Sequence, residues 1–248
     1  MRPLARALAA LALLPLAAAA PARAQPLVAD LSSHLVAITT GFSGTDVLLF
    51  GSLDGEGDVV VVVRGPEERV LVRRKERSMG IFVNRKSLTF DRVPSFYLVA
   101  ASGDLDRIAP PAERTREEIG TDYLRLQPVR ASDPDTVAAY RAALVRDKQA
   151  EGLFARAPGR VAFLGARLFR VDVHFPSNVP VGTYRVQVFL FRNGAVAGAE
   201  TTPLVVGKAG LGAEIYEFAQ HESVAYGVLA VAVALAIGWL VGLLFRRM

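Results

Sequence analysis

The chain has 248 residues, no cysteine, and 29 lysines and arginines against 24 aspartates and glutamates, for a formal net charge of +5. The excess charge lies at the two ends, because residues 1–24 and 223–248 hold five arginines and no acidic residue. The intervening 25–222 is therefore neutral, which excludes the broad basic surface of a nucleic-acid-binding protein. Disulfides and thiolate metal or redox sites are excluded by the lack of cysteine.

Residues 1–24 have the pattern of a secretory signal peptide. Two arginines precede an apolar run over 7–20, and Ala22 and Ala24 place small side chains before a cleavage point. The mature chain is then expected to begin at Gln25. An uncleaved signal anchor is the alternative, although the apolar run is short for a membrane span and prolines interrupt it.

A second apolar segment, Ser223–Phe245, contains 23 residues and no charge. As a helix it would be about 35 Å long, which is enough to cross a bilayer. The arginines in the tail 246–248 predict a cytoplasmic C-terminus by the positive-inside rule. The signal peptide predicts an external N-terminus, so both ends indicate a single-pass protein of the inner (cytoplasmic) membrane with a periplasmic body.

The predicted span also carries a row of small residues at four-residue spacing. Ala230, Ala234, Gly238 and Gly242 would form one slowly drifting stripe on a helix. Such a stripe lets a second helix approach closely, so it predicts self-association or contact with a multi-span membrane protein. The alternative is that alanine and glycine recur by chance in a plain membrane anchor.

Two β-rich blocks are expected in the body at 25–206. The first, over 31–102, contains the apolar runs 47–50 and 59–63 between glycine-rich turn signals. Such runs indicate strands that are buried on both faces or that lie in a sandwich core.

The second block, over 170–206, alternates apolar and polar residues with the period of a strand. Val171, Val173 and Phe175 form one apolar face, and Asn193-Gly194 is a hairpin turn dipeptide. A second inward face is expected from Tyr184, Val186, Val188 and Leu190. The pattern before this hairpin is typical of a late strand of an immunoglobulin-like β-sandwich, and we predict that mainly β fold for the body.

A helical insertion is expected at about 104–155, where valine and phenylalanine become rarer. Ser132 is the expected N-cap of a helix, and Val137, Tyr140 and Leu144 would form its apolar stripe. We expect this stripe to pack on the body itself rather than on a partner. Residues 207–222 are predicted to be a juxtamembrane linker with a short amphipathic helix.

The sequence contains few residues or motifs that indicate catalytic chemistry. No nucleophile elbow, zinc-protease motif, phosphate-binding loop or calcium loop is present in the sequence. His174 and Asp172 share one strand face and could form half of a metal site or a base with its orienting group. Two solvated side chains are the simpler interpretation, so we predict no catalytic residue, no metal and no cofactor.

A basic cluster lies in the first β-rich block. It comprises Arg69, Arg73, Arg74, Lys75 and Arg77. Three glutamates are interspersed with it, and a solvated strand of mixed charge is the simpler interpretation. The functional alternative is a patch that binds anions or lipid headgroups.

Several segments together resemble a known family. They read RRKERSMGIFVN at 73–84, VPSFYLVA at 93–100, GFSGT at 41–45, FG at 50–51 and NVPVGTY at 178–184. The chain resembles over most of its length the transmembrane protein family of alphaproteobacteria called Alph_Pro_TM. The resemblance implies no catalytic residue. It implies association with sulfite-exporter-type permeases, and hence an accessory role in transport.

The sequence therefore predicts a non-enzymatic interaction or accessory protein on one C-terminal transmembrane helix. The alternative is a membrane-tethered hydrolase or metal-binding domain centred on His174 and Asp172.

Overall fold

The computed structural model describes residues 26–78, 81–209 and 223–245. Side chains at 74–86 and part of those in the C-terminal helix lie outside the described residues. The predicted signal peptide, most of the linker at 207–222 and the tail at 246–248 also lie outside them.

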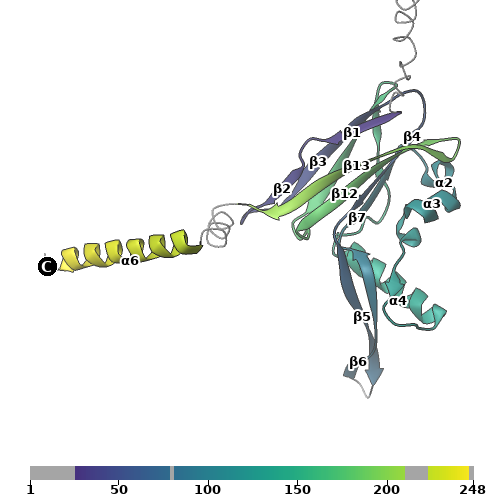
Figure 1. The fold of residues 1–248 in the computed structure, drawn as a ribbon. Helices are drawn as coiled ribbons and strands as arrows, with labels where there is room; N and C mark the ends of the chain where they lie inside the picture. Colours follow the sequence, from purple (N-terminus) through teal and green to yellow (C-terminus); the bar gives the residue numbers. More distant parts are fainter. Residues whose placement is uncertain (1–25, 79–80, 210–222, 246–248) are drawn as a thin grey trace, which may run out of the picture.

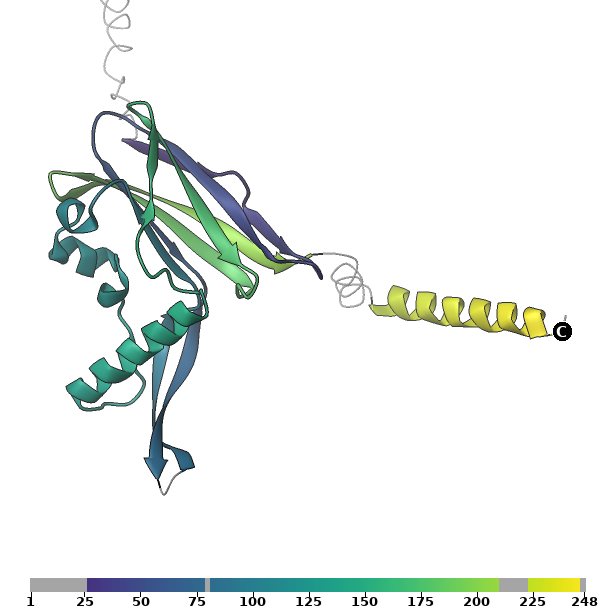
Figure 2. The same ribbon diagram turned by 180° about the vertical axis from the view of Figure 1, so that it is seen from behind.

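The body is mainly β, as the sequence predicts, and two of its sheets form a sandwich (Figures 1 and 2). The first has the order β1 (Leu27–Leu31), β3 (Gly44–Leu53), β11 (Leu168–Pro176) and β10 (Ala162–Leu164). The second has the order β2 (Leu35–Ile38), β13 (Ala195–Lys208), β12 (Gly182–Arg192), β4 (Asp58–Arg64), β7 (Tyr97–Ala101) and β9 (Gly159–Arg160). We refer to these as the four-stranded and six-stranded sheets.

The core between the two sheets is formed by the faces that the sequence predicts. Strand β11 alternates exposed and buried residues, and Val171, Val173 and Phe175 are buried. The ring of Phe175 packs edge-on against Tyr184 of β12, with 5.6 Å between centroids. These inward faces are confirmed, whereas the immunoglobulin-like identity of the sandwich stays a prediction.

The centre of the six-stranded sheet, strand β4, is buried on both faces. All five valines at 59–63 of β4 are fully buried, which explains why this run lacks the alternation of a half-exposed strand. In register, Val61 pairs with Val188 and Val60 with Phe189, and all four side chains are buried. One face packs on the four-stranded sheet, and the helical insertion covers the other (Figure 1).

A long hairpin of β5 (Glu67–Ser78) and β6 (Ile81–Pro94) leaves the sandwich and projects from it (Figure 1). Its base pairs with the short β8 (Gln127–Pro128). We expected this segment to continue the first β-rich block, and its projection from the sandwich was not predicted. The alternation of Val70, Val72, Leu88 and Phe90 gives strand period but contains no information about which sheet a strand joins.

The helical insertion comprises α2 (Leu105–Ile108), α3 (Pro111–Glu117), the 3-10 turn η2 (Thr121–Tyr123) and α4 (Pro134–Ala150). The N-cap of α4 is Asp133, whose carboxylate accepts a hydrogen bond from Thr136 N at 3.1 Å, so the prediction of Ser132 was one residue early. Tyr140 and Leu144 are buried, and α4 packs beside β5. The stripe therefore packs on the body, as predicted.

Tyr97 fastens the insertion to the six-stranded sheet. Its buried hydroxyl donates to the carbonyl of Glu118 and accepts from the backbone N–H of Gly120, both at 2.7 Å. Burial, the largest effect, raises the pKa of Tyr97 to about 12. The fold therefore requires this phenol in its neutral form.

The C-terminal helix α6 (Ser223–Phe245) has the bounds that the sequence predicts and lies apart from the sandwich (Figure 1). Val228, Val231, Leu235, Ile237 and Trp239 are each more than half exposed. Among the residues that the structure describes, however, no helix is found with both the length and the apolar character needed to cross a membrane. The membrane-crossing role predicted for 223–245 is thus not confirmed.

We predict that Val188→Ala lowers the free energy of unfolding by roughly 1–3 kcal/mol, because it removes buried methyl groups and leaves a cavity. The matched control is Val205→Ala on β13, where the side chain is 44% exposed. Chemical denaturation of the full chain in detergent would compare the two. Equal losses would contradict the assigned core face.

Stability should fall as the pH rises from about 10 towards 12. The unfolded chain releases the Tyr97 proton near pH 10, whereas the folded chain retains it to about pH 12, so deprotonation favours unfolding in this window. Tyr97→Phe should be less stable at pH 8, because Gly120 loses its acceptor, but its melting temperature should fall less steeply above pH 10. Parallel melting curves against pH for both proteins would contradict this.

Candidate anion-binding cleft

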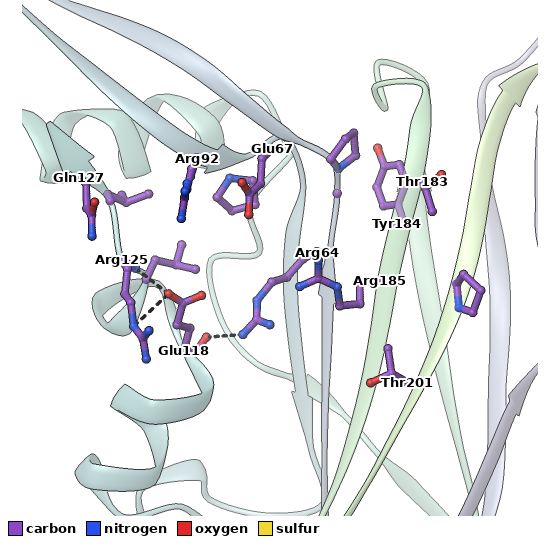
Figure 3. Close-up of a pocket in the computed structure, with 16 residues that line it drawn as sticks. Arg64, Glu67, Arg92, Glu118, Arg125, Gln127, Thr183, Tyr184, Arg185 and Thr201 are labelled. Atoms are coloured by element: carbon purple, nitrogen blue, oxygen red, sulfur yellow. Dashed lines mark hydrogen bonds and ion pairs between the residues drawn. The ribbon is translucent and has the colours of Figure 1, made fainter. Parts of the chain in front are cut away.

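An open cleft of about 540 Å³ lies where the six-stranded sheet, the base of the hairpin and the helical insertion meet (Figure 3). Four arginines and two glutamates line it, which leaves a surplus of two positive charges. These residues are Arg64, Arg92, Arg125, Arg185, Glu67 and Glu118.

Two of the arginines are cross-strand neighbours. Arg64, the last residue of β4, pairs in register with Arg185 of β12, and both line the cleft. Like charges placed directly opposite each other on a sheet destabilise the pair. Arg185 is exposed and makes no side-chain hydrogen bond or ion pair within the described residues, so its charge is available to a ligand.

Arg64 is held in place from two sides. One terminal nitrogen donates to Gln187 on β12, and the other donates to the backbone carbonyls of Glu117 and Glu118 at the end of α3. Its Nε is buried and has no hydrogen-bond partner within the described residues. Burial lowers the pKa of Arg64 from its ordinary value, although the group stays charged at neutral pH.

Glu118 lies between Arg64 and Arg125 (Figure 3). It caps the C-terminus of α3 in the left-handed conformation, at φ 53°. Its carboxylate is 3.4 Å from Nε of Arg125 and accepts a 3.3 Å hydrogen bond from the backbone N–H of the same residue. Arg125 is therefore partly neutralised, unlike Arg185.

Arg92 reaches the cleft from a β-bulge. The register of β5 and β6 shifts between Glu68 and Val70, and Arg92 adopts the left-handed conformation at φ 54°. Glycine is the unstrained choice at such a position, and another residue there costs roughly 1–3 kcal/mol. Arg92 is exposed and, like Arg185, has no side-chain hydrogen bond or ion pair among the described residues.

The rest of the lining supplies hydroxyl groups and an apolar wall. Thr183 and Thr201 are exposed, whereas Leu124 and Leu126 are buried at the edge of the insertion. Tyr184 also lines the cleft, but its hydroxyl donates to the Pro180 carbonyl at 2.6 Å, and burial raises its pKa.

Guanidinium groups bind carboxylate, sulfate and phosphate groups, often with two hydrogen bonds, and do not exchange protons near neutral pH. The cleft is thus chemically suited to hold an anion.

The predicted basic cluster is a different surface from the cleft. Arg69 is exposed and pairs with Asp91 across the hairpin at 3.3 Å, and Arg73 is exposed. The side chains of Arg74, Lys75 and Arg77 lie outside the described residues. Whether this patch binds anions or headgroups stays a prediction.

His174 does not pair with Asp172, on which the enzymatic alternative was centred. Its Nδ1 lies 2.7 Å from the carboxylate of Asp46, its register partner on β3, and both side chains are about two-thirds exposed. No group of three or more potential metal ligands occurs within the described residues. The alternative site at His174 and Asp172 therefore gains no support from the geometry.

The small-residue stripe lies on α6. A Cβ atom added at Gly238 or Gly242 would meet no other atom within 4 Å. The space beside both glycines is therefore open in the described part of this single chain. Helix packing by Ala230, Ala234 and these glycines stays a prediction.

Sequence reasoning missed the cleft, because its arginines come from three different strands and one loop. One signal was available: Arg64 ends a run of five valines, and a charge at the end of a buried strand needs a specific environment.

The body is thus mainly β, and an arginine-lined cleft lies beside its six-stranded sheet. The family described as "Putative transmembrane protein (Alph_Pro_TM)" matches residues 26–247, and the chain belongs to that family. A comparison with curated proteins gave no match.

We predict that Arg185→Gln raises the free energy of unfolding by roughly 0.2–1 kcal/mol, because it removes the like charge opposite Arg64. Arg170→Gln is the control: it removes the same charge from β11, opposite Phe50. The gain should shrink as salt is added. Denaturation of the full chain in detergent tests this, and a loss of stability in Arg185→Gln would contradict it.

Proposed function

We propose that this protein is a non-enzymatic binding protein of the cell envelope. In this proposal its body lies on the outer side of the cytoplasmic membrane and it assists a membrane transport protein. The observation that carries the binding role is the cleft, whose charged lining is dominated by arginines. Such groups hold a ligand through fixed positive charge and are poor proton donors and acceptors for catalysis.

Membrane attachment is supported by the family, which is described as a transmembrane protein family. The proposed span is Ser223–Phe245, which is a continuous helix of 23 residues without charge. This assignment rests on the amino-acid sequence of the segment and on the family. Among the described residues, no helix has the length and apolar character needed to cross a membrane.

The proposed orientation follows from the two ends of the sequence. A signal peptide at 1–24 would export the body, and Arg246 and Arg247 would keep the C-terminus in the cytoplasm. In a cell with two membranes the body would then lie in the periplasm.

The proposed partner is a multi-span membrane protein, or a second copy of this chain, bound through α6. Small side chains at Gly238 and Gly242 would let a partner helix approach closely and gain van der Waals contact. The resemblance to the family points to a sulfite-exporter-type permease as the transporter.

We predict that Gly238→Leu combined with Gly242→Leu weakens self-association or co-purification with a membrane partner, because leucine blocks close helix approach. Affinity purification from mild detergent with mass-spectrometric identification would measure this.

The matched control is Val233→Leu with Val241→Leu. A reporter active only in the cytoplasm, fused after Met248, should stay active in both variants if insertion is intact. An unchanged yield in the glycine variant would reduce α6 to a plain anchor, and an inactive reporter would overturn the orientation.

A further inference from the structure

We infer that the cleft binds a small organic anion with a carboxylate, phosphate or sulfate group. The pair Arg64 and Arg185 would hold that group, and the wall formed by Leu124 and Leu126 would contact the apolar part of the ligand. This inference rests on the proposed binding role and names the class of ligand.

The charges of the two opposed arginines repel each other in the ligand-free chain. Arg64 and Arg185 are directly opposite each other on neighbouring strands, with no carboxylate between them in Figure 3. An anion between two guanidinium groups would replace their mutual repulsion with two attractions. Glu118 does not supply this compensation, because its carboxylate is engaged with Arg125.

Arg64 also has an unused hydrogen-bond donor. Arg64 has its terminal nitrogens bound to Gln187 and to backbone carbonyls, yet its Nε is buried without a partner within the described residues. Buried donors in folded proteins are nearly always paired with protein, water or ligand. The hydrogen bonding of Arg64 is therefore incomplete within the described residues, and a ligand acceptor that reached Nε on a small shift of the side chain would complete it.

Arg92 lines the cleft on the side of the hairpin. It occupies a left-handed bulge position at φ 54° and presents an unpaired charge to the same cleft. Backbone strain of this kind concentrates at functional sites, where it holds a side chain in a required place. Arg92 would therefore add a third cationic contact, from the hairpin side of the cleft.

Size and lining indicate an organic ligand rather than a bare inorganic ion. A volume of about 540 Å³ lies within the range of small-molecule sites and exceeds what one phosphate ion needs. Leucines and prolines form part of the wall, including Leu124, Leu126 and Pro203. An acidic protein segment would be a different kind of partner, and the experiment below distinguishes it.

The test is calorimetric titration of the full chain in a non-ionic detergent with phenyl phosphate, inorganic phosphate, the neutral analogue phenol and a glutamate-rich peptide. We expect phenyl phosphate to bind, inorganic phosphate to bind more weakly, and phenol not to bind. Arg185→Gln should weaken phenyl phosphate binding about 10- to 100-fold, because one charge-assisted contact is lost. Arg92→Gln should weaken it as well.

Arg170→Gln, which removes an equal charge outside the cleft, should bind as the unmodified chain does. Equal weakening in this control would mean general charge attraction and would overturn the inference. Failure of phenyl phosphate to bind, or equal affinity for inorganic phosphate, would overturn the assignment of a small organic anion as the ligand. Binding of the acidic peptide alone would overturn the same assignment. The proposed envelope role is judged separately by the co-purification and reporter experiments, so the two can fail independently.

Discussion

The half-buried guanidinium of Arg64 connects the parts of this structure that matter for function. It extends from the end of a strand made of five buried valines and binds the last carbonyls of α3, so the helical insertion is fixed to the sheet through a charge. A charge removed from water in this way needs hydrogen bonds or opposite charge to replace its hydration. The contacts of Arg64 leave its Nε without a hydrogen-bond partner within the described residues, and they do not neutralise the charge of Arg185 opposite it. Arg64 and the arginine opposite it both line the cleft.

The insertion is required by the six-stranded sheet as much as by the cleft. Val60 and Phe189 face away from the sandwich core, and would be exposed apolar surface without a covering layer. The insertion supplies that layer, and Tyr97 fastens it with two hydrogen bonds. The same packing that stabilises the fold thus places Glu118 and Arg125 at one wall of the cleft.

Stability and binding are opposed at this site. The pairing of Arg64 with Arg185 and the left-handed backbone of Arg92 both destabilise the ligand-free chain. In the proposed binding, an anion held by these arginines would restore part of that free energy. At Arg185 the same charge therefore lowers stability and, in the proposed binding, raises affinity.

The sequence by itself determined what depends on local pattern. The alternation of Val171, Val173 and Phe175 set the core face of β11, and the uncharged run Ser223–Phe245 set the bounds of α6. Period alone cannot tell which sheet a strand joins, so the projecting hairpin of β5 and β6 appeared only in the tertiary structure. The pairing of His174 with Asp46 and the meeting of Arg64 with Arg185 are contacts between residues more than 100 positions apart. Only the strand register brings such residues together, because side-chain spacing along one segment contains no information about its neighbour across the sheet.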